Sequence, residues 1–202
     1  MWNFLARTFS VIFHPLIMPV IGIIFLLYSG SYLSLIQFEG KLFIISVVFI
    51  STFFLPLSLI PMLLYWRLVK NIQMEDRKER FAPMIITAIF YYFCFYVLRT
   101  QGMPYQITLY ILSSLIALTL TLIINWFWKI SAHMIGIGGL TGLILALSIK
   151  LTVSIETILI CVVIIAGIIG SSRLKLNQHN PAQIYAGYAL GLITVFLVNI
   201  FL

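Results

Sequence analysis

Apolar residues in this chain come in long blocks that short polar stretches separate. Hydrophobic residues make up 62% of the 202 and charged residues only 8%, far from the balance of a soluble domain. A helix of about 20 residues crosses the roughly 30 Å of bilayer hydrocarbon. Blocks of about this length cover 9–28, 42–66, 82–98, 107–128, 131–149, 154–170 and 182–202.

These blocks predict an all-α integral membrane bundle that forms one transmembrane domain over 1–202. The blocks at 82–98 and 154–170 are shorter than the others, so the number of transmembrane helices is six or seven. We interpret the first block as a retained helix, since no small-residue cleavage site follows it. The glycine pairs Gly138/Gly142 and Gly187/Gly191 have the spacing that lets two helices pack closely.

Seven crossings divide the polar segments between two faces of the membrane. The face we call A holds the N-terminus, the loop 67–81, the junction at Lys129 and the loop 171–181. The opposite face, B, holds 39–41, 99–105 and 150–153. Face A carries all four tryptophans, which prefer the interface, and nine of the twelve basic residues: Arg7, Arg67, Lys70, Arg77, Lys78, Arg80, Lys129, Arg173 and Lys175. By the positive-inside rule, face A is cytoplasmic.

The chain has three histidines, His14, His133 and His179, and this topology places all of them at or just inside face A. Ionisable residues within a membrane domain often mark a functional site. Gln183 follows His179 by four residues, so on a helix it can hydrogen-bond the imidazole and orient it. His14, beside Pro15, either caps a helix at the head-group level or lines the site.

Two further segments supply groups that can bind phosphate. Ser131 and His133 lie where a helix begins, and unpaired N–H groups there favour an anion; Ser131 can equally act as a simple N-cap. The loop 67–83 is the only charged stretch, and its Lys70, Arg77 and Arg80 can bind phosphoryl oxygens. We expect the acidic residues of this loop to pair with its neighbouring bases, namely Glu75, Asp76 and Glu79 with Arg77, Lys78 and Arg80.

At these residues the chain resembles the type-2 phosphatidic acid phosphatase superfamily of membrane lipid phosphatases, as a divergent member. The three signatures of that family are K-x6-R-P, P-S-G-H and S-R-x5-H-x3-D. The matching residues, in the same order over the core 70–191, are Lys70 and Arg77, then Ser131 and His133, then Ser172, Arg173 and His179. Lys78, Ile130, Ala132 and Gln183 stand where the family has other residues.

The resemblance implies a phosphatase that forms a phosphohistidine intermediate on a lipid phosphate or isoprenyl diphosphate. His179 would be the nucleophile and His133 the general acid. Lys70, Arg77, Ser131, Ser172 and Arg173 would bind the phosphate, with Arg80 and His14 as possible additions. It also implies no metal or cofactor, and a bacterial cytoplasmic membrane in which the site of most relatives is expected on the outer side, opposite to the charge rule.

Gln183 opens an alternative function. It replaces the family's aspartate, and a neutral amide stabilises an imidazolium less well than a carboxylate does. The alternative is therefore a non-catalytic subunit that binds lipid phosphate, transports it or assembles a complex.

A metal site built from the histidines with Glu75 or Asp76 is the third hypothesis, although no closely spaced ligand pair supports it. We expect no nucleic-acid partner, because the positive charge lies in short loops beside helices. The sequence identifies no protein partner.

Overall fold

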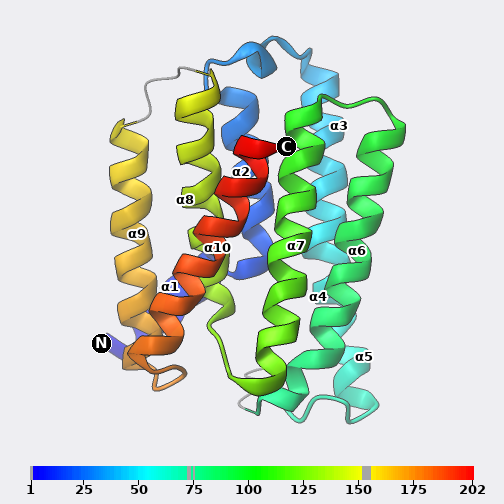
Figure 1. The fold of residues 1–202 in the computed structure, drawn as a ribbon. Coiled ribbons are helices and arrows are strands. Elements are labelled where there is room, and N and C mark those ends of the chain that lie inside the picture. Colours follow the sequence, from blue (N-terminus) through cyan, green and yellow to red (C-terminus); the bar gives the residue numbers. More distant parts are fainter. Residues whose placement is uncertain (1, 72–73, 75, 152–155) are drawn as a thin grey trace.

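The computed structural model describes residues 2–71, 74, 76–151 and 156–202, except for the side chains of residues 2, 3 and 151. Helices make up 84% of the described residues, which contain no strand. Seven helical segments among the described residues are long and apolar enough to cross a membrane. Figure 1 shows the helices packed in one bundle. The predicted all-α membrane bundle is confirmed, and of the two predicted counts the structure has seven.

The last five spans are regular helices: α6 (Phe81–Thr100), α7 (Tyr105–Phe127), α8 (Ala132–Leu151), α9 (Glu156–Lys175) and α10 (Pro181–Phe201). The blocks that are short in the sequence, at 82–98 and 154–170, become α6 and α9, each 20 residues long. Both helices continue beyond their apolar block into polar residues such as Arg99 and Arg173. Each is therefore long enough to span the bilayer without a re-entrant turn.

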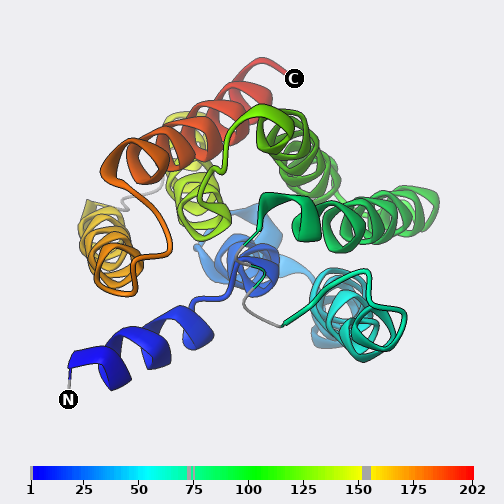
Figure 2. The same ribbon diagram turned by 90° about the horizontal axis from the view of Figure 1, so that it is seen from below.

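The first span is broken, which corrects the prediction of one helix over 9–28. It consists of α1 (Trp2–Ile12), a 3₁₀ turn η1 (Pro15–Ile17) and α2 (Met18–Tyr28). His14 is extended, with φ −64° and ψ 138°, the conformation that a following proline favours. Figure 2 looks along the bundle and shows α1 side-on, while α2 is seen close to end-on. The chain thus turns sharply at His14.

Helix α1 runs crosswise to the spans at the edge of the bundle and is amphipathic. Its Ala6 and Ser10 are buried, and it packs against α9. Phe4 and Val11 on its other side are 72% and 74% exposed. An amphipathic helix that lies across the spans, with large apolar side chains exposed, suits the membrane interface.

The second span is continuous but irregular, and begins earlier than the predicted 42–66. It comprises α3 (Phe38–Phe49), a π-helical turn η3 (Ile50–Phe54), α4 (Leu55–Ser58) and α5 (Ile60–Tyr65). Pro56 has no N–H to donate to the carbonyl of Thr52, so the regular hydrogen-bond pattern is interrupted here. The hydroxyl of Thr52 donates to the carbonyl of Leu16 at 3.4 Å, which ties this span to the break in the first one.

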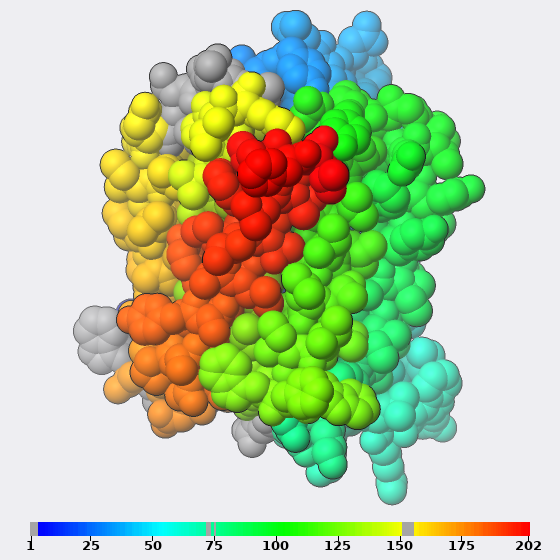
Figure 3. All heavy atoms as spheres, in the orientation of Figure 1, coloured from blue at the N-terminus to red at the C-terminus, as the bar shows by residue number. Residues whose placement is uncertain are grey.

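Helices α8 and α10 make the most extensive contact of any two described helices, through the glycines that the sequence singled out. A Cβ at Gly138 would lie 2.3 Å from the carbonyl oxygen of Tyr188, and one at Gly191 would lie 2.1 Å from that of Ile135. Neither position accepts a larger residue without moving a backbone. The packing role of these glycines is confirmed. In Figure 3, α10 crosses this side of the molecule as a diagonal band between α9 and α7.

The helix ends that form face A lie together at the lower end of Figure 1. There α5, α7 and α9 end, and α6, α8 and α10 begin. Trp66, Trp126 and Trp128 lie in this region and are partly exposed, as expected at an interface; the side chain of Trp2 lies outside the described residues. A short 3₁₀ helix, η4 (Arg77–Arg80), precedes α6.

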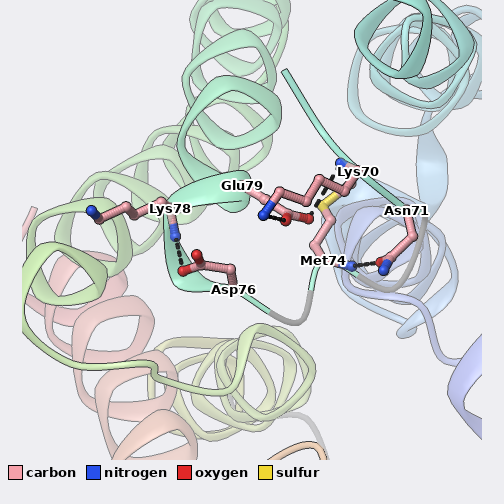
Figure 4. Close-up of polar contacts among 6 residues, drawn as sticks. All are labelled: Lys70, Asn71, Met74, Asp76, Lys78 and Glu79. Atoms are coloured by element: carbon pink, nitrogen blue, oxygen red, sulfur yellow. Dashed lines mark hydrogen bonds and ion pairs between the residues drawn. The ribbon is translucent and has the colours of Figure 1, made fainter. Parts of the chain in front are cut away.

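The acidic residues of the charged loop make different contacts from those expected. Glu79 lies 3.9 Å from Lys70, and Asp76 accepts from the backbone N–H of Lys78 at 3.0 Å and so caps η4 (Figure 4). Both contacts serve to fold the loop, since the chain reverses direction within it. The predicted pairing of Glu75 lies outside the described residues.

Candidate functional site

The three histidines come from three separate segments and line one cavity at the face A end of the bundle. His14 follows α1, His133 lies in the first turn of α8, and His179 directly precedes the cap of α10. The rings of His14 and His133 meet edge to face, with centroids 5.6 Å apart. The structure thus gathers side chains that are up to 165 residues apart in the sequence.

The turn at Pro15 orients His14. The backbone N–H of Leu16 donates to Nδ1 of His14 at 3.4 Å, so this ring nitrogen caps η1. In the neutral ring the proton therefore lies on Nε2. His14 both caps a helix and lines the cavity, which combines the two interpretations that the sequence left open.

The backbone of Ser10 orients His133. Nε2 of His133 lies 3.0 Å from the carbonyl oxygen of Ser10, in the last turn of α1, where helical carbonyls lack partners within their own helix. Because a carbonyl oxygen only accepts, Nε2 carries a proton. The other ring nitrogen, Nδ1, is the one that can act on a ligand.

A side-chain amide sets the orientation of His179. Oε1 of Gln183 accepts from the backbone N–H of Asn180 at 3.2 Å, and the side chain of Asn180 accepts from the N–H of Gln183 at 2.9 Å. This capping box fixes which end of the amide is the oxygen. The same Oε1 lies 3.1 Å from Nδ1 of His179. Nδ1 therefore donates, and Nε2 keeps a free lone pair in the neutral ring.

The surroundings of His179 favour the neutral ring. Burial, and after it the positive charge of Arg80, lower the pKa of His179 to about 4, although the hydrogen bond to Gln183 acts in the opposite direction. At pH 7 the imidazole is therefore neutral, with Nε2 available as a nucleophile.

Two arginines complete the polar part of the cavity, Arg80 from η4 and Arg173 from α9. Nε of Arg80 donates to the carbonyl of Met74 at 3.1 Å, and Nη1 of Arg173 donates to the hydroxyl of Ser10 at 3.2 Å. Nε of Arg173 is buried without a hydrogen-bond partner among the described residues. The described lining contains no aspartate or glutamate. Such a surplus of donors and positive charge suits an anion.

The cavity continues from this polar part into the bundle and has a volume of about 400 Å³. Apolar side chains from α2, α4, α6, α7 and α10 form most of its other walls, among them Met18, Pro56, Leu57, Met84, Ala117 and Val195. A volume of this size lies within the range of about 300–1,000 Å³ that is typical of ligand sites. The combination of an anion-binding end and an apolar interior fits an amphiphile with a negatively charged head.

Lys70 and Arg77, the residues that match the first signature, make their contacts away from this cavity. The Lys70 side chain is 79% exposed and pairs with Glu79. The guanidinium of Arg77 donates to the carbonyl of Phe127, and its own carbonyl accepts from Asn125 at 2.9 Å, so Arg77 fastens the loop to the end of α7. Arg80, three residues later, is the arginine of this loop that lines the cavity.

The two predicted serine ligands also differ in placement. The hydroxyl of Ser172 donates to the carbonyl of Ile168 at 2.8 Å, one turn earlier in α9, and Ser172 lines a separate groove beside α1. The hydroxyl of Ser131 is fully buried and has no hydrogen-bond partner among the described residues, so it makes no N-cap bond with them. Its backbone N–H instead contacts the carbonyl of Gln183 at 3.4 Å, which joins the start of α8 to α10.

Sequence reasoning missed Ser10 and Asn125. Ser10 contacts both His133 and Arg173, although 123 and 163 residues separate them in the chain. Asn125 is a buried amide in the otherwise apolar block of α7, and it lines the cavity while holding the charged loop. A buried polar residue in a membrane helix is a usable signal for Asn125. Ser10 offered no such signal, since a serine near a chain end is common.

The geometry gives no support to a metal centre. Among residues 2–71, 74, 76–151 and 156–202, no group of three or more His, Cys, Asp or Glu side chains is placed to hold a metal ion. Asp76, a proposed ligand of that hypothesis, caps η4 instead. Glu75 lies outside the described residues.

The seven spans fit an integral multi-pass membrane protein. No protein-family model, curated protein or solved structure gives a match to this chain. The function is therefore inferred from the site itself.

Proposed function

We propose that this protein is a membrane phosphatase that removes the phosphoryl group from a lipid phosphate or isoprenyl diphosphate. One observation carries the proposal: a neutral, oriented His179 with a free Nε2 lines, together with Arg80, Arg173 and His133, the polar part of a cavity whose other walls are mainly apolar. Phosphoryl transfer requires mainly positioning and positive charge around the phosphoryl oxygens, and this site offers both.

In the proposed reaction, Nε2 of His179 attacks phosphorus, and the bond between phosphorus and the lipid oxygen breaks. Before the bond breaks, Nδ1 of His133 takes the acidic proton of the bound phosphate monoanion, since the other ring nitrogen, Nε2, already donates its own proton to the carbonyl of Ser10. Nδ1 then passes this proton to the leaving oxygen, and His133 returns to its neutral form. Water then attacks the phosphohistidine and gives a proton to Nδ1 of His133, the N–P bond breaks with its electron pair returning to Nε2 of His179, and inorganic phosphate leaves with the proton from His133. Arg80 and Arg173 stabilise the charge on the phosphoryl oxygens in both steps.

The low pKa of His179 predicts how its reactivity depends on pH. A histidine with the ordinary pKa of about 6.5 loses its neutral form below that pH. With a pKa of about 4, His179 stays neutral from pH 7 down to pH 5 and becomes protonated only below 4. We expect the rate of carbethoxylation of His179, followed by mass spectrometry of its peptide, to be level between pH 7 and 5. A midpoint near 6.5 would contradict the described burial of the ring.

The second candidate function is a subunit that binds lipid phosphate without cleaving it, and the neutral Gln183 is the observation that favours it. The variant Gln183→Glu separates the two functions. Glutamate keeps the reach of Gln183 Oε1 to Nδ1 of His179 and to the N–H of Asn180, and adds a charge that stabilises imidazolium.

In a phosphatase, Gln183→Glu should raise kcat by about tenfold or more. The reverse change, from a carboxylate to an amide beside the catalytic histidine, lowers kcat in serine proteases. In a binding subunit it should only weaken the affinity for a lipid phosphate, because it adds a negative charge next to an anion. Phosphate release and vesicle binding, measured on the same preparations, distinguish these results. Gln178→Ala in the same loop serves as the control.

For sidedness, we propose that face A lies in the cytoplasm of a bacterial cell, because nine of the twelve basic residues belong to it. The described chain ends at Leu202, near the opposite end of the bundle in Figure 1. A reporter that is active only outside the cytoplasm should therefore give a signal when it is fused after Leu202. A silent reporter on a stably expressed fusion would place the site on the outer side.

A further inference from the structure

We infer that Ser10 of α1 is a positioning residue that holds Arg173 and His133 for the phosphoryl group. This inference rests on the proposed function, because it assigns Ser10 a role in the same site. Two different atoms of Ser10 are involved: the hydroxyl oxygen accepts from Nη1 of Arg173 at 3.2 Å, and the carbonyl oxygen accepts from Nε2 of His133 at 3.0 Å. Ser10 itself is buried, at 7% exposure.

Arg173 depends on this contact more than an ordinary arginine would. No carboxylate within salt-bridge distance of Arg173 is found in the part of the chain that the structure describes. The hydroxyl of Ser10 is therefore its observed side-chain partner, while Nε remains free for a ligand. Ser10 also lies in the last turn of α1, and the partial negative charge at a helix C-terminus stabilises nearby cations. One end of the guanidinium is thus held, and the other is available to an anion.

The break at Pro15 is what brings Ser10 to the site. If the apolar block 9–28 formed one straight helix, Ser10 would lie a full turn beyond His14 along the same axis. The turn at His14 instead directs α1 crosswise to the spans and out along the edge of the bundle (Figure 2). There its buried side, with Ala6 and Ser10, packs on α9. The interfacial helix therefore completes a site whose other residues belong to the spans and their connecting loops.

The test compares Ser10→Ala with Ser10→Thr and with the control Thr8→Ala. Thr8 lies on the same helix, and its hydroxyl donates to the carbonyl of Phe4 on the exposed side. The readouts are KM for a lipid phosphate, the inhibition constant of inorganic phosphate, and kcat. Ser10→Ala removes the hydroxyl that holds Arg173, so the guanidinium is no longer aligned with the bound phosphate. We therefore expect KM and the inhibition constant to rise about tenfold and kcat to change by less. Ser10→Thr keeps the hydroxyl and should restore both, and Thr8→Ala should match the wild type.

A merely structural contact would lower the active fraction, and hence apparent kcat, without changing the inhibition constant of phosphate. If the wild type is active and the inhibition constant of phosphate is the same in Ser10→Ala, this inference is overturned while the proposed function stands. A wild type that neither cleaves nor binds any lipid phosphate would overturn the proposed function, and this inference with it.

Discussion

Replacing His179 by glutamine is expected to abolish phosphate release, with a loss of about 10⁴-fold or more, the scale at which enzymes lose activity with their nucleophile. Glutamine is similar in size and can still donate to Oε1 of Gln183, so the loop before α10 should keep its shape. It has no ring nitrogen to attack phosphorus. The measurement is phosphate release by purified protein in detergent, over a panel of lipid phosphates and isoprenyl diphosphates.

The control for His179→Gln is Gln178→Ala, one residue earlier in the same loop, which should retain the wild-type rate. A second readout follows the intermediate itself: radiolabelled substrate should transfer an acid-labile label to the peptide that contains His179. Full activity in His179→Gln, or no turnover by the wild type across the whole panel, would contradict the phosphatase proposal.

Much of the fold follows from the sequence because the bilayer restricts the solutions. Every backbone polar group in hydrocarbon needs a partner, so apolar blocks of about 20 residues must be helices. The glycine pairs of α8 and α10 predicted their contact for an equally direct reason, since only a missing side chain permits that approach.

The site was predictable only in part, because its geometry depends on irregular segments. The spacing of His179 and Gln183 predicted their hydrogen bond, since both face one side of a helix start. The spacing of Lys70 and Arg77 did not predict where their side chains lie, because both residues belong to a loop. Contacts with the end of α7 set the path of that loop. Arg80 faces the cavity instead. The crosswise course of α1 was hidden by an apolar block that reads as continuous through His14 and Pro15.

The cavity itself had no sequence signature, because several breaks in helix geometry contribute to it. Pro15, Pro19, Pro56 and Pro83 all line it. Each lacks an N–H and begins or interrupts a helical turn, which keeps neighbouring backbones from packing as closely as α8 and α10 do. The sequence shows these prolines plainly, but it does not show that they meet at one place.

Filling the apolar end of this cavity is expected to separate substrates by chain length. Ala117 lines the cavity from α7, ten residues before Phe127 at the face A end, or about 15 Å along the helix axis. The variant Ala117→Phe puts a ring where the chain of a bound lipid would lie. A long chain then cannot enter to its full depth, and the phosphate is displaced from Nε2 of His179.

The expected loss is steric, since the bilayer or detergent solvates an excluded chain as well as the cavity does. Misplacement of a reacting group by about 1 Å can cost roughly 10²-fold. For Ala117→Phe we therefore expect kcat/KM to fall about 10²-fold with hexadecyl phosphate and to change little with hexyl phosphate. Thr119→Phe adds the same ring to the exposed side of α7 and should leave both values unchanged. Equal losses for both substrates in Ala117→Phe would mean that the ring disturbs the fold. Unchanged values for both would mean that the chain binds elsewhere, between the spans and the surrounding lipid.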